Sequence, residues 1–374
     1  MIPFNKASLV GQEIENVLEA FKGGHISGDG PFTKKCHALI ENIIGGKALL
    51  TTSCTHALEM TALLLDLQPG DEVIVPSFTF VSTVNAFVLR GARPVFIDVR
   101  SDTLNLDERL LPGLMTPRVK AIVPVHYAGV GCEMDEILRI AGEHDVPVIE
   151  DNAHGLFGRY KDRALGSFGS FSTLSFHETK NISCGEGGAL LINEPKYIAR
   201  AEILREKGTN RSAFFRGQID KYGWVDVGSS FLPSEILAAF LYAQLGAYET
   251  VQSRRRQVWD TYHQRLATWA ERTEVRLPQV PTHCTQPHHM FYLVMRSLEQ
   301  RTAFIAHMKA RDVMAVFHYL PLHLSPMGKQ FGGRPGDCPV TEDVSDRLVR
   351  LPLYVGLAES QQEAVLDAIH AFPG

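Results

Sequence analysis

The sequence predicts an α/β protein with a mostly parallel central sheet flanked by helices, plus a small C-terminal α/β domain. Short apolar runs alternate with segments of helical periodicity, at spacings that suit right-handed crossovers between parallel strands. Polar residues follow several of these runs, at the sheet edge where open α/β sheets bind their ligands. The chain of 374 residues is 45% hydrophobic and 21% charged, which suits a two-domain globular protein. We expect a large domain at residues 1–245 and a small one at 246–374.

Two amphipathic helices are expected before the first strand. Residues 11–24 place their apolar side chains on one helical face. These side chains are Ile14, Val17, Leu18 and Phe21. A glycine-rich loop follows at 25–35, and a second amphipathic helix runs through 36–45. From the residues alone, the loop is either a flexible connector or a functional segment.

The next segment, residues 48–67, predicts a strand, a turn and a helix. Ser53, Cys54 and Thr55 fall where the helix begins. Unpaired backbone N–H groups and the helix dipole favour an anion at such a position, and the hydroxyl groups add donors. Simple N-capping by Ser53 or Thr55 is the alternative interpretation. No GxGxxG motif follows a strand, so a dinucleotide-binding turn is not indicated.

Two further strand and helix units follow. Residues 69–99 predict a strand, a connection, a helix and a strand, and Phe80 in the connection can be an ordinary core residue. Residues 119–137 predict the next strand, a loop and the start of a helix, with His126 and Tyr127 at the carboxyl end of the strand. Each unit has the length expected of a crossover in a mostly parallel sheet.

Two polar residues at strand ends form the centre of the predicted site. Residues 146–155 begin with a buried parallel strand that ends at Asp151. Residues 167–188 start as an alternating strand, carry Lys180 into a polar turn and finish in glycines. Most lysines are solvated surface charges, but desolvation would lower the pKa of this ammonium group and free the amine as a nucleophile. A lysine and a carboxylate at one sheet edge are the pair that pyridoxal phosphate requires.

The rest of the chain predicts helices and then a small mixed domain. Residues 194–208 are expected to form a helix. Residues 209–230 form a long irregular stretch, whose four aromatic residues argue against disorder. One or two long helices follow at 234–271. The small domain is expected to contain strands at 289–296 and 314–320 and helices at 301–313, 344–354 and 359–372.

Composition and charge argue against several classes of protein. The formal net charge of −5 leaves no basic footprint for nucleic acid. No apolar run approaches the roughly 20 residues that span a bilayer, and the N-terminus does not resemble a secretion signal. The six cysteines form no CxxC pair, and no histidine spacing suggests a metal site. We expect a cytoplasmic protein with no metal, nucleic-acid or membrane partner.

Three motifs, and longer segments around them, resemble one family. EDNAHG at 150–155, SFSTLSFHETKN at 170–181 and GEGG at 185–188 are similar to motifs of the DegT/DnrJ/EryC1/StrS sugar-nucleotide aminotransferases, a fold type I pyridoxal phosphate family. The similarity covers nearly the whole chain and is greatest to the branch that aminates dTDP-4-keto-6-deoxyhexoses at C4. It implies pyridoxal 5'-phosphate as cofactor, L-glutamate as amino donor and a homodimer with shared active sites. In such a dimer a loop like 27–33 reaches the active site of the neighbouring subunit.

The resemblance also implies roles for individual residues. Lys180 corresponds to the lysine that bonds to the cofactor, Asp151 supports the pyridine nitrogen, and His154 orients the phenolic oxygen or Asp151. Cys54 stands where the phosphate-binding turn usually has glycine. Ser230 stands where many members carry an asparagine that reaches the cofactor phosphate of the opposite subunit. The other implied cofactor contacts are Ser53, Thr55, Phe80, which would stack on the pyridine ring, and Ser175. The candidate substrate-binding residues are Arg211, Arg216, His318 and Tyr319.

Three alternatives compete with this function. Sugar 3-dehydratases of the same family carry a histidine at the lysine position, so Lys180 argues against that activity. A second alternative is an aminotransferase for another keto compound, such as a C3-keto sugar or a cyclitol. The third is a non-catalytic sensor that binds the cofactor or a nucleotide sugar. A sensor predicts no absorbance change when glutamate is added, whereas an aminotransferase converts its cofactor to the amine form.

Overall fold

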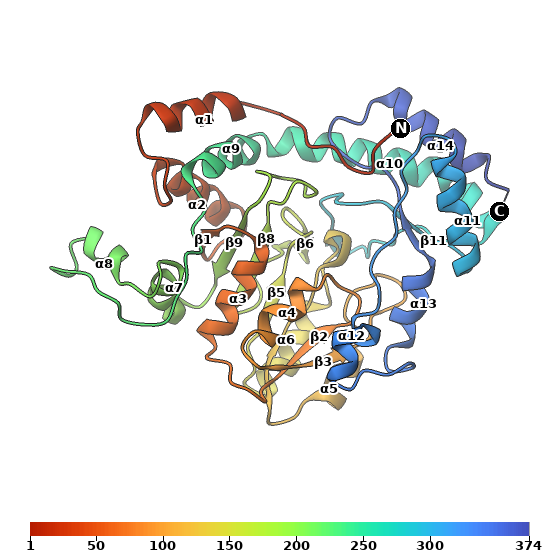
Figure 1. Cartoon of the computed structure of the whole chain (residues 1–374). Coiled ribbons are helices and arrows are strands. Elements are labelled where there is room, and N and C mark those ends of the chain that lie inside the picture. Colours follow the sequence, from red (N-terminus) through yellow and green to blue (C-terminus); the bar gives the residue numbers. More distant parts are fainter. Residues whose placement is uncertain (374) are drawn as a thin grey trace.

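The computed structural model describes residues 1–373, which fold around a central sheet (Figure 1). Its strands are β1 (Lys47–Thr51), β2 (Glu72–Pro76), β3 (Arg93–Ile97), β4 (Val119–Ile122), β5 (Ile149–Asp151), β8 (Phe171–Ser175) and β9 (Gly188–Ile192). One half of the sheet has the order β1-β9-β8-β5, and the other half has the order β3-β2-β4. Parallel bridges from Ile122 to Val148 and from Val125 to Asp151 join the two halves.

One strand of the sheet, β9, is antiparallel to both of its neighbours. It pairs antiparallel with β1 and β8, whereas β5 and β8, β2 and β3, and β2 and β4 pair in parallel. The prediction of a mostly parallel sheet is therefore confirmed. Because β5 and β8 are parallel neighbours, their carboxyl ends meet at the same edge, and Asp151 pairs with Thr173, two residues before β8 ends.

Helices cover both faces of the sheet because strand side chains alternate between its two sides. The helices of this part are α1 (Glu13–Lys22), α2 (Pro31–Ile44), α3 (Cys54–Leu64), α4 (Ser82–Val88), α5 (Leu111–Leu114), α6 (Met134–Glu143), α7 (Ile198–Arg205), α8 (Arg211–Phe215) and α9 (Glu235–Gly246). On β9, Leu190 and Ile192 share a core with α3 and α7. Ala189 and Leu191 share another with α2 and α9.

The C-terminal part has a core of its own. The fully buried members of this core all lie between Val258 and Phe372. The elements of the region are α10 (Tyr248–Thr273), β11 (Tyr292–Val294), α11 (Leu298–Lys309), α12 (Pro326–Gln330), α13 (Pro339–Arg347), β12 (Leu348–Arg350) and α14 (Glu359–His370). Three short strands form a separate small sheet: β6 (Arg159–Tyr160), β7 (Arg163–Ala164) and β10 (Cys284–Thr285). A break at Ala247 separates α9 from α10. The domain boundary at residue 245 stays a prediction.

Three expectations about local structure are wrong. Residues 314–320 form no strand, and Val316 only bridges to Arg350. Residues 344–354 are not one helix, because α13 ends at Arg347 and β12 pairs antiparallel with β11. Residues 209–230 are not wholly irregular, since they contain α8. The second error has a physical cause: pairing of β12 with β11, which is distant in the chain, decides a structure that local spacing does not reveal.

Helix α1 forms as expected, but its apolar side is not covered. Ile14, Leu18 and Phe21 are 52%, 52% and 53% exposed. Glu13 is buried instead, accepts hydrogen bonds from two backbone amides of the preceding loop and receives a third from Gln244 of α9. The buried side of α1 is therefore fixed to α9 through polar groups.

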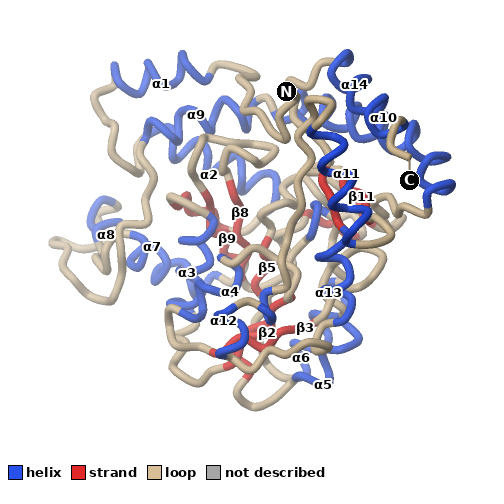
Figure 2. Tube along the Cα trace, turned by 45° about the vertical axis from the view of Figure 1, so that its right-hand side comes forward, coloured by secondary structure: helices blue, strands red, loops and turns tan. Residues whose placement is uncertain are grey.

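The two views agree on the outline of the molecule. Helix α8 and its flanking loops extend away from the sheet beyond α7, while α10 and α14 lie at the other end (Figures 1 and 2). Within residues 1–373, no helix is long and apolar enough to cross a membrane.

Candidate active site

Lys180 lies in the turn between β8 and β9, and its side chain lines a cavity of about 450 Å³. The backbone N–H of Lys180 donates to the His177 carbonyl at 2.9 Å, which closes the turn. Burial lowers the pKa of Lys180 to about 8, although the nearby Cys54 and Asp151 act in the opposite direction. Such an amine loses its proton more readily than a surface lysine, as a nucleophile toward a carbonyl requires.

Asp151 ends β5 and lines the same cavity. Its Oδ2 accepts a hydrogen bond from Thr83 Oγ1 of α4 at 2.7 Å, and its Oδ1 accepts one from the Ala153 amide at 3.2 Å. Burial raises the pKa of Asp151, while these two hydrogen bonds and the Lys180 charge oppose the rise. The carboxyl group is thus held in one orientation with a fixed partner on each oxygen.

The N-terminus of α3 provides backbone donors beside Lys180. Ser53 is the N-cap, and its Oγ accepts from the His56 amide at 3.1 Å, so the capping interpretation is confirmed for Ser53. Amides earlier in a first helical turn have no partner within the helix, which leaves those of Cys54 and Thr55 for an anion. A Cβ atom at Gly188 would lie 2.3 Å from the Ser53 carbonyl carbon, so only glycine lets β9 begin against this turn.

Aromatic rings also line the cavity. Phe80 lies in the connection that precedes α4, is half exposed, and packs 6.3 Å from the ring of Tyr319. His154 stacks on His289 with ring centres 4.4 Å apart. Burial holds the pKa of His154 well below its ordinary value, and its Nδ1 is buried with no hydrogen-bond partner in residues 1–373. A neutral imidazole with an unpaired nitrogen is available to a polar group bound in the cavity.

Most of the predicted site residues line this one cavity. They come from the ends of β5 and β8, the start of α3, the connection after β2 and the segment before α12. They are Ser53, Cys54, Thr55, Phe80, Asp151, His154, Ser175, Lys180, His318 and Tyr319.

Three predicted residues line a different cavity. Ser230, Arg211 and Arg216 face a space of about 820 Å³ between α7, α8 and the glycine-rich loop. Each arginine has an acidic partner on α7 or directly after it: Arg211 pairs with Glu206 at 3.1 Å, and Arg216 with Glu202 at 2.7 Å. Within one chain these residues do not reach Lys180, so their roles stay predictions that require a second subunit.

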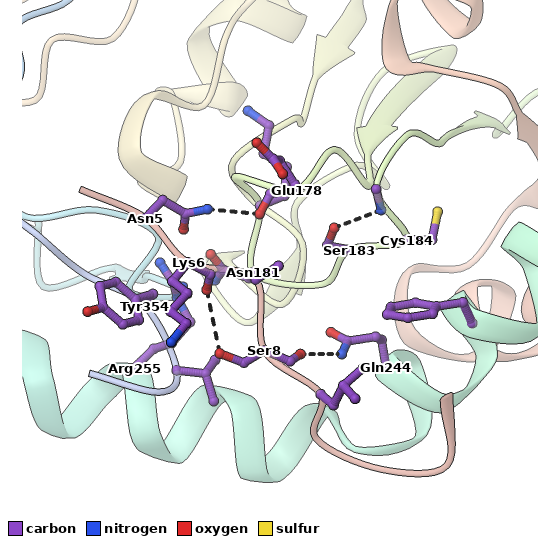
Figure 3. Close-up of a pocket in the computed structure, with 16 residues that line it drawn as sticks. Asn5, Lys6, Ser8, Glu178, Asn181, Ser183, Cys184, Gln244, Arg255 and Tyr354 are labelled. Atoms are coloured by element: carbon purple, nitrogen blue, oxygen red, sulfur yellow. Dashed lines mark hydrogen bonds between the residues drawn. The ribbon is translucent and has the colours of Figure 1, made fainter. Parts of the chain in front are cut away.

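A third cavity, of about 400 Å³, is lined by the N-terminal segment and by Glu178, Asn181 and Ser183 (Figure 3). Asn5 donates to the Glu178 carbonyl at 3.0 Å, and Gln244 donates to the Ser8 carbonyl at 3.0 Å. The N-terminal segment therefore ties the loop of Lys180 to α9. Lys180 lines both this cavity and the one with Asp151. Sequence reasoning assigned no role to the N-terminal segment.

Comparison with known proteins identifies the family. The model of the DegT/DnrJ/EryC1/StrS aminotransferase family matches residues 8–370. The chain belongs to this family. Membership confirms the predicted fold class, the aminotransferase activity and the cofactor, pyridoxal phosphate.

Three similar proteins illustrate the match. The uncharacterized protein MJ1066 from Methanocaldococcus jannaschii is 35% identical, over 96% of this chain and 94% of its own. The crystal structure of the aminotransferase TlmJ from Streptoalloteichus hindustanus has a TM-score of 0.91 at 30% identity, and the match covers 99% of this chain and 98% of TlmJ. Spr1654 from Streptococcus pneumoniae, described as a sugar aminotransferase and solved in its PMP form, gives 0.91 at 26% identity with the same coverage.

The residues of this aminotransferase fit pyridoxal phosphate. The cavity offers a lysine of lowered pKa, a fixed carboxylate for the pyridine nitrogen, free amides at a helix N-terminus for the phosphate, and an unpaired histidine nitrogen. Within residues 1–373 no group of three metal-ligating side chains could hold a metal ion.

Among the residues that line this cavity and that sequence reasoning did not assign to the site are Thr83, His289 and Arg350. Thr83 carries a weak signal, as a hydroxyl residue in the first turn of a helix that follows a predicted strand. His289 and Arg350 carry none, because no spacing in the chain links them to Lys180.

Proposed function

We propose that this aminotransferase acts on a keto sugar and transfers the amino group of L-glutamate to C4 of a dTDP-linked 4-keto-6-deoxyhexose. The products would be 2-oxoglutarate and a dTDP-4-amino-4,6-dideoxyhexose. The observation that carries the proposal is the meeting of Lys180 and Asp151 in one cavity beside the anion-binding start of α3. The similarity to a protein described as a sugar aminotransferase supports a sugar substrate, and the sequence segments that resemble the C4 branch support the position of amination.

The chain supplies a proton carrier and a charged partner for this chemistry. Bound pyridoxal phosphate supplies an electron sink that lets a proton leave the α-carbon of an amino acid. Lys180 Nζ, with its pKa of about 8, would accept that proton and, in the second half of the reaction, deliver one to C4 of the sugar. Asp151, held by Thr83 and Ala153, would keep the pyridine nitrogen protonated. Ser53, Thr55 and the first amides of α3 would hold the phosphate, and Phe80 would pack against the ring.

We further propose a cytoplasmic homodimer in which each active site is completed by the other chain. The arginines of α8, Ser230 and the loop 27–33 would serve the cofactor and substrate of the opposite subunit. In support of this, part of that loop, Ser27 to Asp29, lines the same open cavity as Arg211 and Arg216. The exposed apolar residues of α1 offer further surface for such a contact.

The test follows the absorbance of the cofactor in two steps. Addition of L-glutamate to the loaded enzyme should convert the aldehyde form to the amine form. Subsequent addition of a dTDP-4-keto-6-deoxyhexose should restore the aldehyde form and yield an aminated sugar whose substituted carbon is read by NMR. Amination at C3 would contradict the predicted position. If no amino acid alters the absorbance of the wild-type enzyme, the protein is a sensor and the proposal is wrong.

A further inference from the structure

Arg350 brings a guanidinium group to the wall of the Lys180 cavity. It is the last residue of β12. Its backbone N–H donates to the Val316 carbonyl at 2.7 Å, and its carbonyl accepts from the Val316 N–H at 3.2 Å. Its position is therefore set by the small domain, while its side chain faces the site built by the sheet.

The charge of Arg350 is not neutralised within the chain. Among the described residues, no carboxylate lies within ion-pair distance of it, in contrast to Arg347, which pairs with Asp343 at 2.6 Å. Arg350 Nε is buried and has no hydrogen-bond partner in residues 1–373. The ring of Phe4 covers the guanidinium at 4.4 Å. A buried cation without a counter-ion is costly, and burial accordingly lowers the pKa of Arg350.

One contact orients Arg350 without neutralising it. Its Nη1 lies 2.9 Å from His318 Nδ1, and His318 Nε2 lies 2.9 Å from Tyr127 Oη. Because a guanidinium can only donate, Nδ1 accepts, and the neutral ring carries its proton on Nε2 and donates it to Tyr127. Burial first, and then the Arg350 charge, hold the pKa of His318 well below its ordinary value. His318 is thus a positioning residue for Arg350.

His177 also lines the cavity, but its Nε2 lies 3.7 Å from Glu186 Oε1, and the other basic groups do not compete for an anion. Burial lowers the pKa of His154, His289 and His318 well below the ordinary value, so these rings are neutral at pH 7. Lys180 is engaged by the reaction itself. Among the described residues that line the cavity, Arg350 is the one arginine.

We propose that Arg350 binds a carboxylate of the amino donor in this cavity. This inference rests on the proposed function, because any amino-acid donor carries a carboxylate next to the amino group that is transferred. The planar guanidinium fork matches two carboxylate oxygens, and Arg350 lines the cavity wall. A carboxylate on the sugar would have the same chemistry, and the experiment separates the two sources.

The test measures binding of 2-oxoglutarate to the aldehyde form of the loaded enzyme, with which this keto acid cannot exchange an amino group. Calorimetry should give a Kd roughly 10- to 100-fold higher for Arg350→Gln than for the wild type, the range for loss of a charge-assisted hydrogen-bonded pair. Arg350→Lys should show a smaller loss. Arg347→Gln removes a neighbouring arginine outside the cavity and should bind as the wild type does. Cofactor absorbance and thermal unfolding check that each variant is folded and loaded.

Two results would overturn the inference. One is unchanged 2-oxoglutarate binding in a folded, loaded Arg350→Gln enzyme. The other is a variant that reacts normally with L-glutamate but loses only the sugar step, which would assign Arg350 to a carboxylate on the sugar. Failure of the proposed function is distinct from both, because the wild-type enzyme itself would then show no conversion by any amino acid.

Discussion

The Lys180 cavity and the cavity beside α8 both contain charged side chains, but these side chains differ in burial and in ion pairing. In the first, Lys180, Asp151 and Arg350 are withdrawn from water, and none of the three has an ion-pair partner among the described residues. In the second, Arg211 and Arg216 are paired with glutamates of their own chain. Unpaired, desolvated charges are ready for a ligand, whereas paired and solvated ones must exchange partners first.

The supporting structure explains the difference. The first cavity is built at the edge of the central sheet, where strand pairing fixes Asp151 beside Thr173, two residues before Ser175. The second is formed by a segment that extends from the molecule, where Phe215 and Trp224 are 68% and 82% exposed. An aromatic surface of this kind is typical of a protein interface. One chain therefore gathers the residues that fit the cofactor in one cavity, whereas the second cavity would serve the substrate only in the proposed dimer.

The largest effect should come from Lys180→Ala. Loss of the nucleophile and proton carrier should lower turnover by at least about 10²–10⁴-fold, measured as the rate of conversion by L-glutamate. The proposed dimer should persist in gel filtration, because Lys180 lines cavities within one chain. A variant that retains more than a tenth of the wild-type rate would show that another group moves the proton.

Asp151→Asn should have the next largest effect. It removes a charge and keeps the shape, so the rate should fall by roughly 10²–10³-fold, the effect of losing one preorganised electrostatic partner. Thr83→Val removes one hydrogen bond to Asp151 and should lower the rate by less than Asp151→Asn does. Equal losses in the two variants would argue that Asp151 acts only through its orientation.

A mixing experiment tests whether the second cavity serves the partner chain. The double variant Arg211→Gln, Arg216→Gln should be weakly active, and so should Lys180→Ala. Random mixed dimers of the two should regain roughly a quarter of wild-type activity, since half of the dimers contain one intact site of two. If mixing restores no activity although mixed dimers form, each site is built from one chain.

The smallest effect concerns stability at mildly acidic pH. His154, His289 and His318 are held neutral by burial in the folded chain, whereas the unfolded chain takes up protons with a pKa near 6.5. The free energy of unfolding should therefore decrease as pH falls below about 6.5, by up to roughly 1.4 kcal/mol per histidine per pH unit. Urea unfolding at several pH values measures the slope, and His318→Gln should make it shallower. A slope of zero between pH 6.5 and 5 would contradict the burial of these rings.

Sequence reasoning predicted the parts of the site that follow strands. Asp151 and Lys180 were found because a buried strand before each one implies a position at the sheet edge. Arg350 was missed because its segment has helical spacing, and only pairing with the distant strand β11, where Tyr292 lies opposite Arg350, makes it a strand. The periodicity of α1 predicted a helix but not that Ile14, Leu18 and Phe21 stay exposed, since periodicity does not show what packs against an apolar face.

The most direct test of the central claim is borohydride reduction of the loaded enzyme, followed by peptide mass mapping of the pyridoxyl adduct. We predict one adduct, on the peptide that contains Lys180, because burial has made this amine nucleophilic and placed it beside Asp151. An adduct on a different lysine, or an unmodified Lys180 in protein saturated with pyridoxal phosphate, would contradict the proposed active site.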